Sequence, residues 1–87
     1  MTRTEMQQTI IAALGRVAPE VSAATLATDK PIRDQVDLDS VDYLNFVIEL
    51  HTQMGVDIPE ADYGKLTSID AAIDYLAAKI GSTSVRN

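Results

Sequence analysis

The sequence predicts an all-α protein, a small four-helix bundle of three long helices and one short one, with a long loop between the first and second helices. Apolar residues recur at helical spacing in three stretches, no stretch alternates like a strand, and residues 16–39 lack any sustained period. A chain of 87 residues has room for one such domain. We expect the bundle to occupy residues 1–81 and residues 82–87 to form a flexible C-terminal tail.

The first helix is predicted from its cap and its apolar face. Thr2 with Glu5, or Thr4 with Gln7, has the spacing of a capping box. The residues that follow place one apolar stripe on the helix: Met6, Ile10, Leu14 and Val17. In the connection after it, four apolar residues can pin the chain to the helices: Val21, Leu26, Ile32 and Val36.

The second helix is predicted over residues 40–54, a short turn of helix over 60–65, and the last helix after Thr67, with Asp70 completing its cap. The last helix carries a regular apolar stripe: Ile69, Ala72, Ile73, Leu76, Ala77 and Ile80. A glycine stands at or near the end of each of the three long stretches and is expected to end the helix there: Gly15, Gly55 and Gly81.

The composition excludes several kinds of site. There is no cysteine and only one histidine, so disulfides, thiolate metal sites and multi-histidine metal sites are not expected. Four aspartates crowd together without the glycine and the terminal glutamate of a calcium loop: Asp34, Asp37, Asp39 and Asp42. No apolar run is long enough to enter a membrane, and we expect a cytoplasmic protein.

Acidic residues are concentrated in the middle of the chain. The net charge is −6, and no Lys or Arg stands between Arg33 and Lys65. Nucleic acids and anionic membranes are therefore unfavourable partners, whereas a basic protein surface is complementary. Like charges also oppose self-association, so we expect a monomer. Eight acids lie in this stretch: Asp34, Asp37, Asp39, Asp42, Glu49, Asp57, Glu60 and Asp62.

The second helix has two apolar faces on a helical wheel. One face, expected to point into the bundle, contains Tyr43, Phe46, Val47, Leu50 and Met54. The other face contains Val41, Leu44 and Ile48, with the acids Asp42 and Glu49 along one edge. An exposed apolar stripe rimmed by acids is typical of a protein-docking surface. The alternative is that the long loop folds over this second stripe.

Asp39 and Ser40 stand where the second helix begins. Local chemistry alone favours a structural role, because a Ser or Asp side chain at this place caps orphan backbone N–H groups. The same position also suits a phosphodiester, because the hydroxyl lies at the positive end of the helix dipole. Ser40 is too far from His51 for a catalytic pair, since eleven residues of helix span about 16 Å.

Three segments together resemble the acyl carrier proteins: Val36-Asp37-Leu38-Asp39-Ser40-Val41-Asp42, Gly55-Val56-Asp57-Ile58-Pro59 and Ala71-Ala72-Ile73-Asp74-Tyr75-Leu76. The resemblance implies a stand-alone carrier without catalytic activity of its own. It implies that a phosphopantetheinyl transferase attaches 4′-phosphopantetheine from coenzyme A to Ser40, which Asp39 precedes. An acyl group is then held as a thioester on this arm and delivered to partner enzymes in lipid, fatty acid or polyketide synthesis.

The resemblance also assigns the two faces of the second helix. It implies partner contacts through Val41, Asp42, Leu44 and Ile48, and the remaining acids expected at basic docking patches are Glu49, Glu60 and Asp62. The partners implied are an acyl-loading ligase or transferase and acyl-using enzymes. Seven residues match positions that line the bundle and its acyl-holding cavity: Phe46, Leu50, Met54, Ile58, Leu66, Ala72 and Leu76.

Several residues depart from the pattern of the family. Asn45, His51 and Thr52 stand where the carriers of bacterial fatty acid synthesis have acids, and Phe46 is bulkier than the aliphatic residue expected there. These departures favour a specialised carrier over a housekeeping one. The alternative function is an unmodified acidic helical adaptor that uses the same exposed stripe to bind a basic protein partner.

Overall fold

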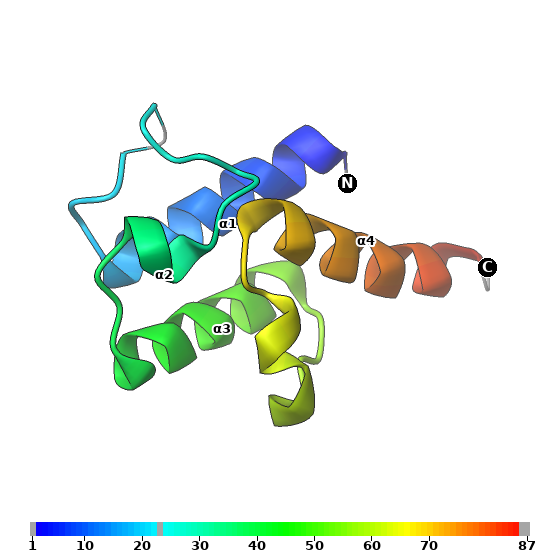
Figure 1. Cartoon of the computed structure of the whole chain (residues 1–87). Coiled ribbons are helices and arrows are strands. Elements are labelled where there is room, and N and C mark those ends of the chain that lie inside the picture. The colour runs from blue at the N-terminus through cyan, green and yellow to red at the C-terminus, as the bar shows by residue number, and fades with distance from the viewer. Residues whose placement is uncertain (1, 23, 86–87) are drawn as a thin grey trace.

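The computed structural model describes residues 2–22 and 24–85, with side chains through residue 80. It contains helices α1 (Arg3–Val17), α2 (Ile32–Gln35), α3 (Ser40–Met54) and α4 (Ile69–Val85), and a 3-10 helix, η1 (Glu60–Lys65) (Figure 1). The all-α class, the three long helices and the short turn over 60–65 are as predicted, whereas α2 was not anticipated. Within the described ranges, no helix is both long and apolar enough to cross a bilayer.

The start of α1 is fixed by the first of the two predicted capping boxes. The Thr2 hydroxyl accepts a hydrogen bond from the Glu5 N–H at 3.1 Å, and the Glu5 carboxylate accepts one from the Thr2 N–H at 2.7 Å. Two orphan donors at the helix N-terminus are thereby satisfied. These bonds to Thr2 also hold the pKa of the Glu5 carboxyl below its usual value.

Only one of the three glycines predicted to end a helix does so. Gly55 adopts a left-handed conformation with φ of +66°, and its N–H donates to the carbonyl of His51. The predictions for the other two were wrong, because α1 continues through Gly15 to Val17 and α4 continues through Gly81 to Val85. A glycine inside a helix costs about 1 kcal/mol relative to alanine but does not by itself break the hydrogen-bond ladder.

The cap of α4 lies one residue later than predicted. The Ser68 hydroxyl accepts the hydrogen bond of the Ala71 N–H at 3.0 Å, which is the N-cap arrangement. Asp70 does not complete a cap with Thr67. Its carboxylate accepts a hydrogen bond from the Thr28 hydroxyl at 3.4 Å, and its N–H donates to the Thr28 carbonyl. Asp70 therefore joins the long loop to α4.

The core is aliphatic apart from Phe46, which is fully buried. Helix α1 packs against both α3 and α4, and α4 also contacts η1. The residues buried in α1 and α4 are those of the predicted stripes or next to them: Met6, Ile10, Ala13, Leu14, Ile69, Ala72, Ile73 and Leu76. Helix α3 adds Phe46, Val47 and Leu50. The bundle therefore buries one face of each long helix.

The long connection between α1 and α3 loops outward before α2 (Figure 1), but it is anchored to the bundle at several points. Ile32 and Val36 are buried in the core, and Val21 and Leu26 pack against it, as predicted. The Ile32 N–H donates to the carbonyl of Thr67 at 2.8 Å, which ties α2 to the segment before α4. The loop and α2 therefore form a wall beside the start of α3 without covering its outer face.

We expect the two faces of α3 to respond differently to truncation. Leu50→Ala should lower the free energy of unfolding by about 2–5 kcal/mol, because Leu50 is fully buried and the change leaves a cavity. Ile48→Ala, on the exposed face, should change it by no more than about 0.5 kcal/mol. Urea unfolding followed by circular dichroism measures both. Equal losses would contradict the assignment of the faces.

Candidate functional site

Asp39, and not Ser40, caps α3. One Asp39 carboxylate oxygen accepts a hydrogen bond from the Asp42 N–H at 2.8 Å, and the Asp42 carboxylate lies 3.5 Å from the Asp39 N–H in return. The two aspartates form a capping box around the first turn. Of the two residues that the local interpretation offered as the cap, Asp39 fills the role and Ser40 does not.

Ser40 is the first residue of α3 and its side chain is exposed. Within the part of the chain that the structure describes, no hydrogen bond engages its hydroxyl. The hydroxyl thus lies free at the N-terminus of a 15-residue helix, where the helix dipole stabilises negative charge. An exposed, unengaged hydroxyl at this end of the helix fits a phosphodiester attachment.

The second apolar stripe of α3 is exposed, as the docking-surface interpretation predicts. The exposed fractions are 64% for Val41, 42% for Leu44 and 49% for Ile48. The alternative, in which the long loop covers this stripe, is not what the structure has. The stripe begins directly after Ser40, so a partner bound to it also reaches the serine.

The acids expected at the partner surface differ in whether their side chains already have partners within the protein. Glu60 is exposed, whereas Asp42 belongs to the capping box. Glu49 lies toward α1, with one carboxylate oxygen 3.6 Å from the Arg16 guanidinium. Asp62 accepts a hydrogen bond of 2.6 Å from the Tyr75 hydroxyl and pairs with Lys65 at 3.4 Å. Three of the four acids therefore also have structural partners.

The Asp62–Tyr75 contact shifts both groups. The hydrogen bond from Tyr75, with help from Lys65, holds the pKa of the Asp62 carboxyl below its usual range. Partial burial, together with the hydrogen bond and the negative charge of Asp62, raises the pKa of Tyr75 to about 12. Both groups keep their ordinary charge state near neutral pH, and the contact fixes η1 against α4.

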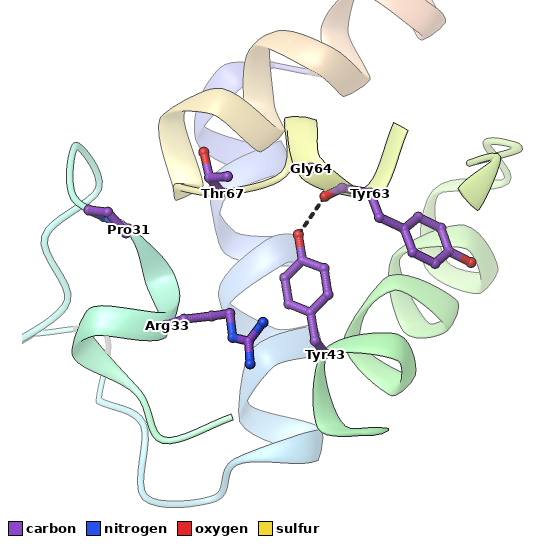
Figure 2. Close-up of a pocket in the computed structure, with 6 residues that line it drawn as sticks. All are labelled: Pro31, Arg33, Tyr43, Tyr63, Gly64 and Thr67. Atoms are coloured by element: carbon purple, nitrogen blue, oxygen red, sulfur yellow. Dashed lines mark hydrogen bonds between the residues drawn. The ribbon is translucent and has the colours of Figure 1, made fainter. Parts of the chain in front are cut away.

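The residues expected to line the acyl-holding cavity are packed into the core. Met54 is partly buried. The other six are buried: Phe46, Leu50, Ile58, Leu66, Ala72 and Leu76. None of the seven lines the pocket shown in Figure 2. Their burial accounts for the stability of the bundle, and nothing in it distinguishes a cargo-holding role.

A pocket that sequence reasoning missed lies beside the start of α3 (Figure 2). It has a volume of about 230 Å³ and is lined by Pro31, Arg33, Tyr43, Tyr63, Gly64 and Thr67. These residues come from α2, α3, η1 and the flanking links, so no local pattern in the sequence groups them. Of the six, only Tyr43 was singled out from the sequence, and it was assigned to the inner face of the second helix and not to a pocket.

Tyr43 connects three of the elements around this pocket. Its hydroxyl donates to the carbonyl of Tyr63 at 2.7 Å and lies 3.2 Å from that of Leu66. The Arg33 guanidinium carbon lies 5.8 Å from the centre of the Tyr43 ring, a cation–π distance. Burial raises the pKa of the Tyr43 phenol, and the nearby charge of Arg33 opposes that rise.

Other kinds of site receive no support from the arrangement of side chains. One ring nitrogen of His51 lies 2.8 Å from the carbonyl of Val56, which places the ring at the C-terminal end of α3, opposite Ser40. Among residues 2–22 and 24–85, no three acidic or histidine side chains are grouped to hold a metal ion. The candidate site is therefore Ser40 with the surfaces on either side of it.

Comparison with known proteins gives matches in sequence and in structure, although no family model matches the chain. The sequence is 27% identical over 56 residues to an acyl carrier protein from Rubrobacter xylanophilus, covering 64% of this chain and 69% of that protein. The fold is similar to that of the acyl carrier protein from Enterococcus faecalis, with a TM-score of 0.74 and 28% identity. That match covers 91% of this chain and 99% of the other.

The chain is therefore similar to acyl carrier proteins in sequence as well as in its helical fold. The matched proteins in both comparisons are acyl carrier proteins, so the resemblance inferred from the sequence is confirmed. Acyl carrier proteins carry a covalently attached 4′-phosphopantetheine, have no catalytic activity of their own, and work with acyl-handling enzymes and a phosphopantetheinyl transferase.

The capping box predicts an unequal effect of two neighbouring substitutions. Asp39→Ala should lower the free energy of unfolding by about 1 kcal/mol, because it removes the acceptor for the Asp42 N–H. Ser40→Ala should change it by no more than about 0.5 kcal/mol, because the hydroxyl caps nothing. Thermal and urea unfolding of the unmodified protein measure both. A larger loss in Ser40→Ala would restore Ser40 as the cap.

Proposed function

We propose that Ser40 is the residue to which 4′-phosphopantetheine is attached, and that this chain carries acyl groups on the arm. The proposal rests on the different roles of neighbouring residues at the start of α3. Asp39 and Asp42 cap the helix, and the adjacent Ser40 hydroxyl remains exposed and without a hydrogen bond in the described chain. The helix dipole at this end favours a phosphate ester.

Attachment changes only one bond of the protein. The Ser40 oxygen forms a bond to the pantetheine-bearing phosphorus of coenzyme A, the bond from that phosphorus to the adenosine bisphosphate breaks, and the hydroxyl proton is removed in the transferase. The arm then supplies the thiol that holds the acyl group as a thioester. This supply of sulfur matches a chain without cysteine.

Delivery to partner enzymes is proposed to use the exposed stripe of α3. Val41, Leu44 and Ile48 offer apolar contact area within three turns of Ser40. Glu60 and the partly engaged acids supply a negative field around it, which speeds encounter with basic patches. Each exposed ion pair contributes only about 0–1 kcal/mol, which suits a carrier that must leave one enzyme for the next.

A specialised rather than housekeeping role is supported by the outer face of α3. Asn45, His51 and Thr52 are exposed and uncharged or weakly basic, so this face has fewer acids than the resemblance leads one to expect. Partner enzymes that read such a face need fewer basic residues there. We therefore propose that the loading ligase or transferase of this carrier is dedicated to it.

The mass of the protein tests the attachment site. Incubation with coenzyme A and a broad-specificity phosphopantetheinyl transferase should add one phosphopantetheine to the wild-type chain and none to Ser40→Ala, as measured by intact-protein mass spectrometry. A second, exposed serine offers the matched control, since Ser22→Ala should be modified like wild type. No gain in a folded wild-type protein, with an active transferase, would favour the unmodified adaptor instead.

The stripe predicts a second, kinetic outcome. The double variant Leu44→Ala with Ile48→Ala should raise the KM of the transferase for this protein about tenfold while leaving kcat nearly unchanged, because it removes apolar contact area and not the serine. A double variant of exposed α1 residues, Thr4→Ala with Gln8→Ala, should leave KM unchanged. An unchanged KM in the stripe variant would remove the stripe from the docking surface.

A further inference from the structure

The pocket of Figure 2 differs in charge from the segment around it. Of its six lining residues, Arg33 alone has a charged side chain. The chain has a net charge of −6, and the 31 residues from Asp34 to Gly64 contain no Lys or Arg. The pocket is therefore a basic recess in the most acidic third of the protein.

The Arg33 guanidinium is held in place but not neutralised. One of its nitrogens donates to the carbonyl of Leu38 at 3.2 Å, and its carbon lies over the ring of Tyr43. Figure 2 shows the guanidinium directed toward Tyr43, whereas the Tyr63 side chain points away from it. Within the described chain, Arg33 makes no ion pair with a carboxylate. Most of its five N–H donors are therefore left for another acceptor.

Residues that line the recess or anchor Arg33 stand on both sides of Ser40 in the sequence. Leu38, which anchors Arg33, stands two residues before Ser40, and Tyr43 stands three residues after it. A group attached to Ser40 through a flexible arm can therefore fold back between α2 and η1. At about 230 Å³ the recess is smaller than the pockets that hold drug-sized ligands, so it suits a short group.

We propose that this recess receives the far end of the cargo carried on Ser40, and that Arg33 selects short acyl groups that end in a carboxylate. The inference rests on the proposed function. A guanidinium matches a carboxylate with two parallel hydrogen bonds, and the Tyr43 ring offers an apolar wall for the methylenes between the carboxylate and the arm. A plain hydrocarbon placed there would strip water from the guanidinium without replacing its hydrogen bonds.

The test compares two cargoes that differ in their end group. Holo-protein carrying a glutaryl group, with its free carboxyl enriched in ¹³C, is compared with holo-protein carrying a pentanoyl group. Both are amide-linked to the arm, so that neither hydrolyses during the titration. The carboxyl pKa, followed by ¹³C NMR, should be about one unit lower in wild type than in Arg33→Gln. Lys30→Gln, an exposed base of the same loop outside the recess, should match wild type.

A second readout follows the arginine itself. The side-chain Nε–H resonance of Arg33 should move when the glutaryl group is present and stay in place with the bare arm or the pentanoyl group. Equal carboxyl pKa values in wild type and Arg33→Gln would overturn the inference. A resonance that moves fully with the bare arm would also overturn it, because Arg33 would then bind the phosphodiester.

Failure of the proposed carrier function gives a different experimental result from failure of the cargo inference. The intact mass of each sample is first measured by mass spectrometry. A protein to which no phosphopantetheine is attached at Ser40 would overturn the carrier function and the cargo inference together. A chain that is loaded but shows no shift would overturn only the cargo inference. Free glutaryl-pantetheine titrated into the unmodified protein should move the Arg33 resonance, and free pentanoyl-pantetheine should not.

Discussion

The reciprocal hydrogen bonds between Asp39 and Asp42 determine where α3 begins, and much of the molecule depends on that starting point. The start fixes the rotation of every later residue of the helix. It places Phe46 and Leu50 toward the bundle and Val41 and Ile48 toward solvent. It also leaves Ser40 at the first helical position with an exposed hydroxyl that no hydrogen bond engages in the described chain, as the proposed attachment requires.

The same helix thereby serves two opposed requirements. Its inner face excludes water and so stabilises a domain of only 87 residues, and its outer face is apolar yet exposed, as the proposed docking surface requires. The loop between α1 and α3 could have covered the outer face, but backbone hydrogen bonds tie it instead to the segment before α4. The anchoring of α2 through Ile32 therefore leaves the stripe exposed and places α2 where Pro31 and Arg33 line the recess.

Sequence reasoning succeeded where one local pattern decided the outcome. Both ends of α3 were predictable, because Ser40 follows an acidic cap and Gly55 supplies the left-handed residue at the end. It failed where two local solutions compete. Asp39 and Ser40 are both good caps, as are Thr67 and Ser68, and only the path of the preceding chain chooses between them. The four residues of α2 are too few to show a period.

The site divides in the same way. The exposed stripe was predictable because three apolar residues share one face of a single helix. The engagement of Glu49 by Arg16 and of Asp62 by Tyr75 was not, since each pair joins residues far apart in the sequence. The recess was invisible for the same reason. Its six residues span 37 positions of the chain and meet only after η1 has packed near α3.

The position of α1 has a consequence for the order in which the chain is made. This helix packs against α3 and also against α4, which are separated from it by very different lengths of chain. During synthesis α1 emerges before α3, and α3 before α4. The part of the apolar face of α1 that packs against α4 therefore stays exposed until α4 has been synthesised. The core is therefore complete only when the first and the last of these helices are in contact, after nearly the whole domain has emerged.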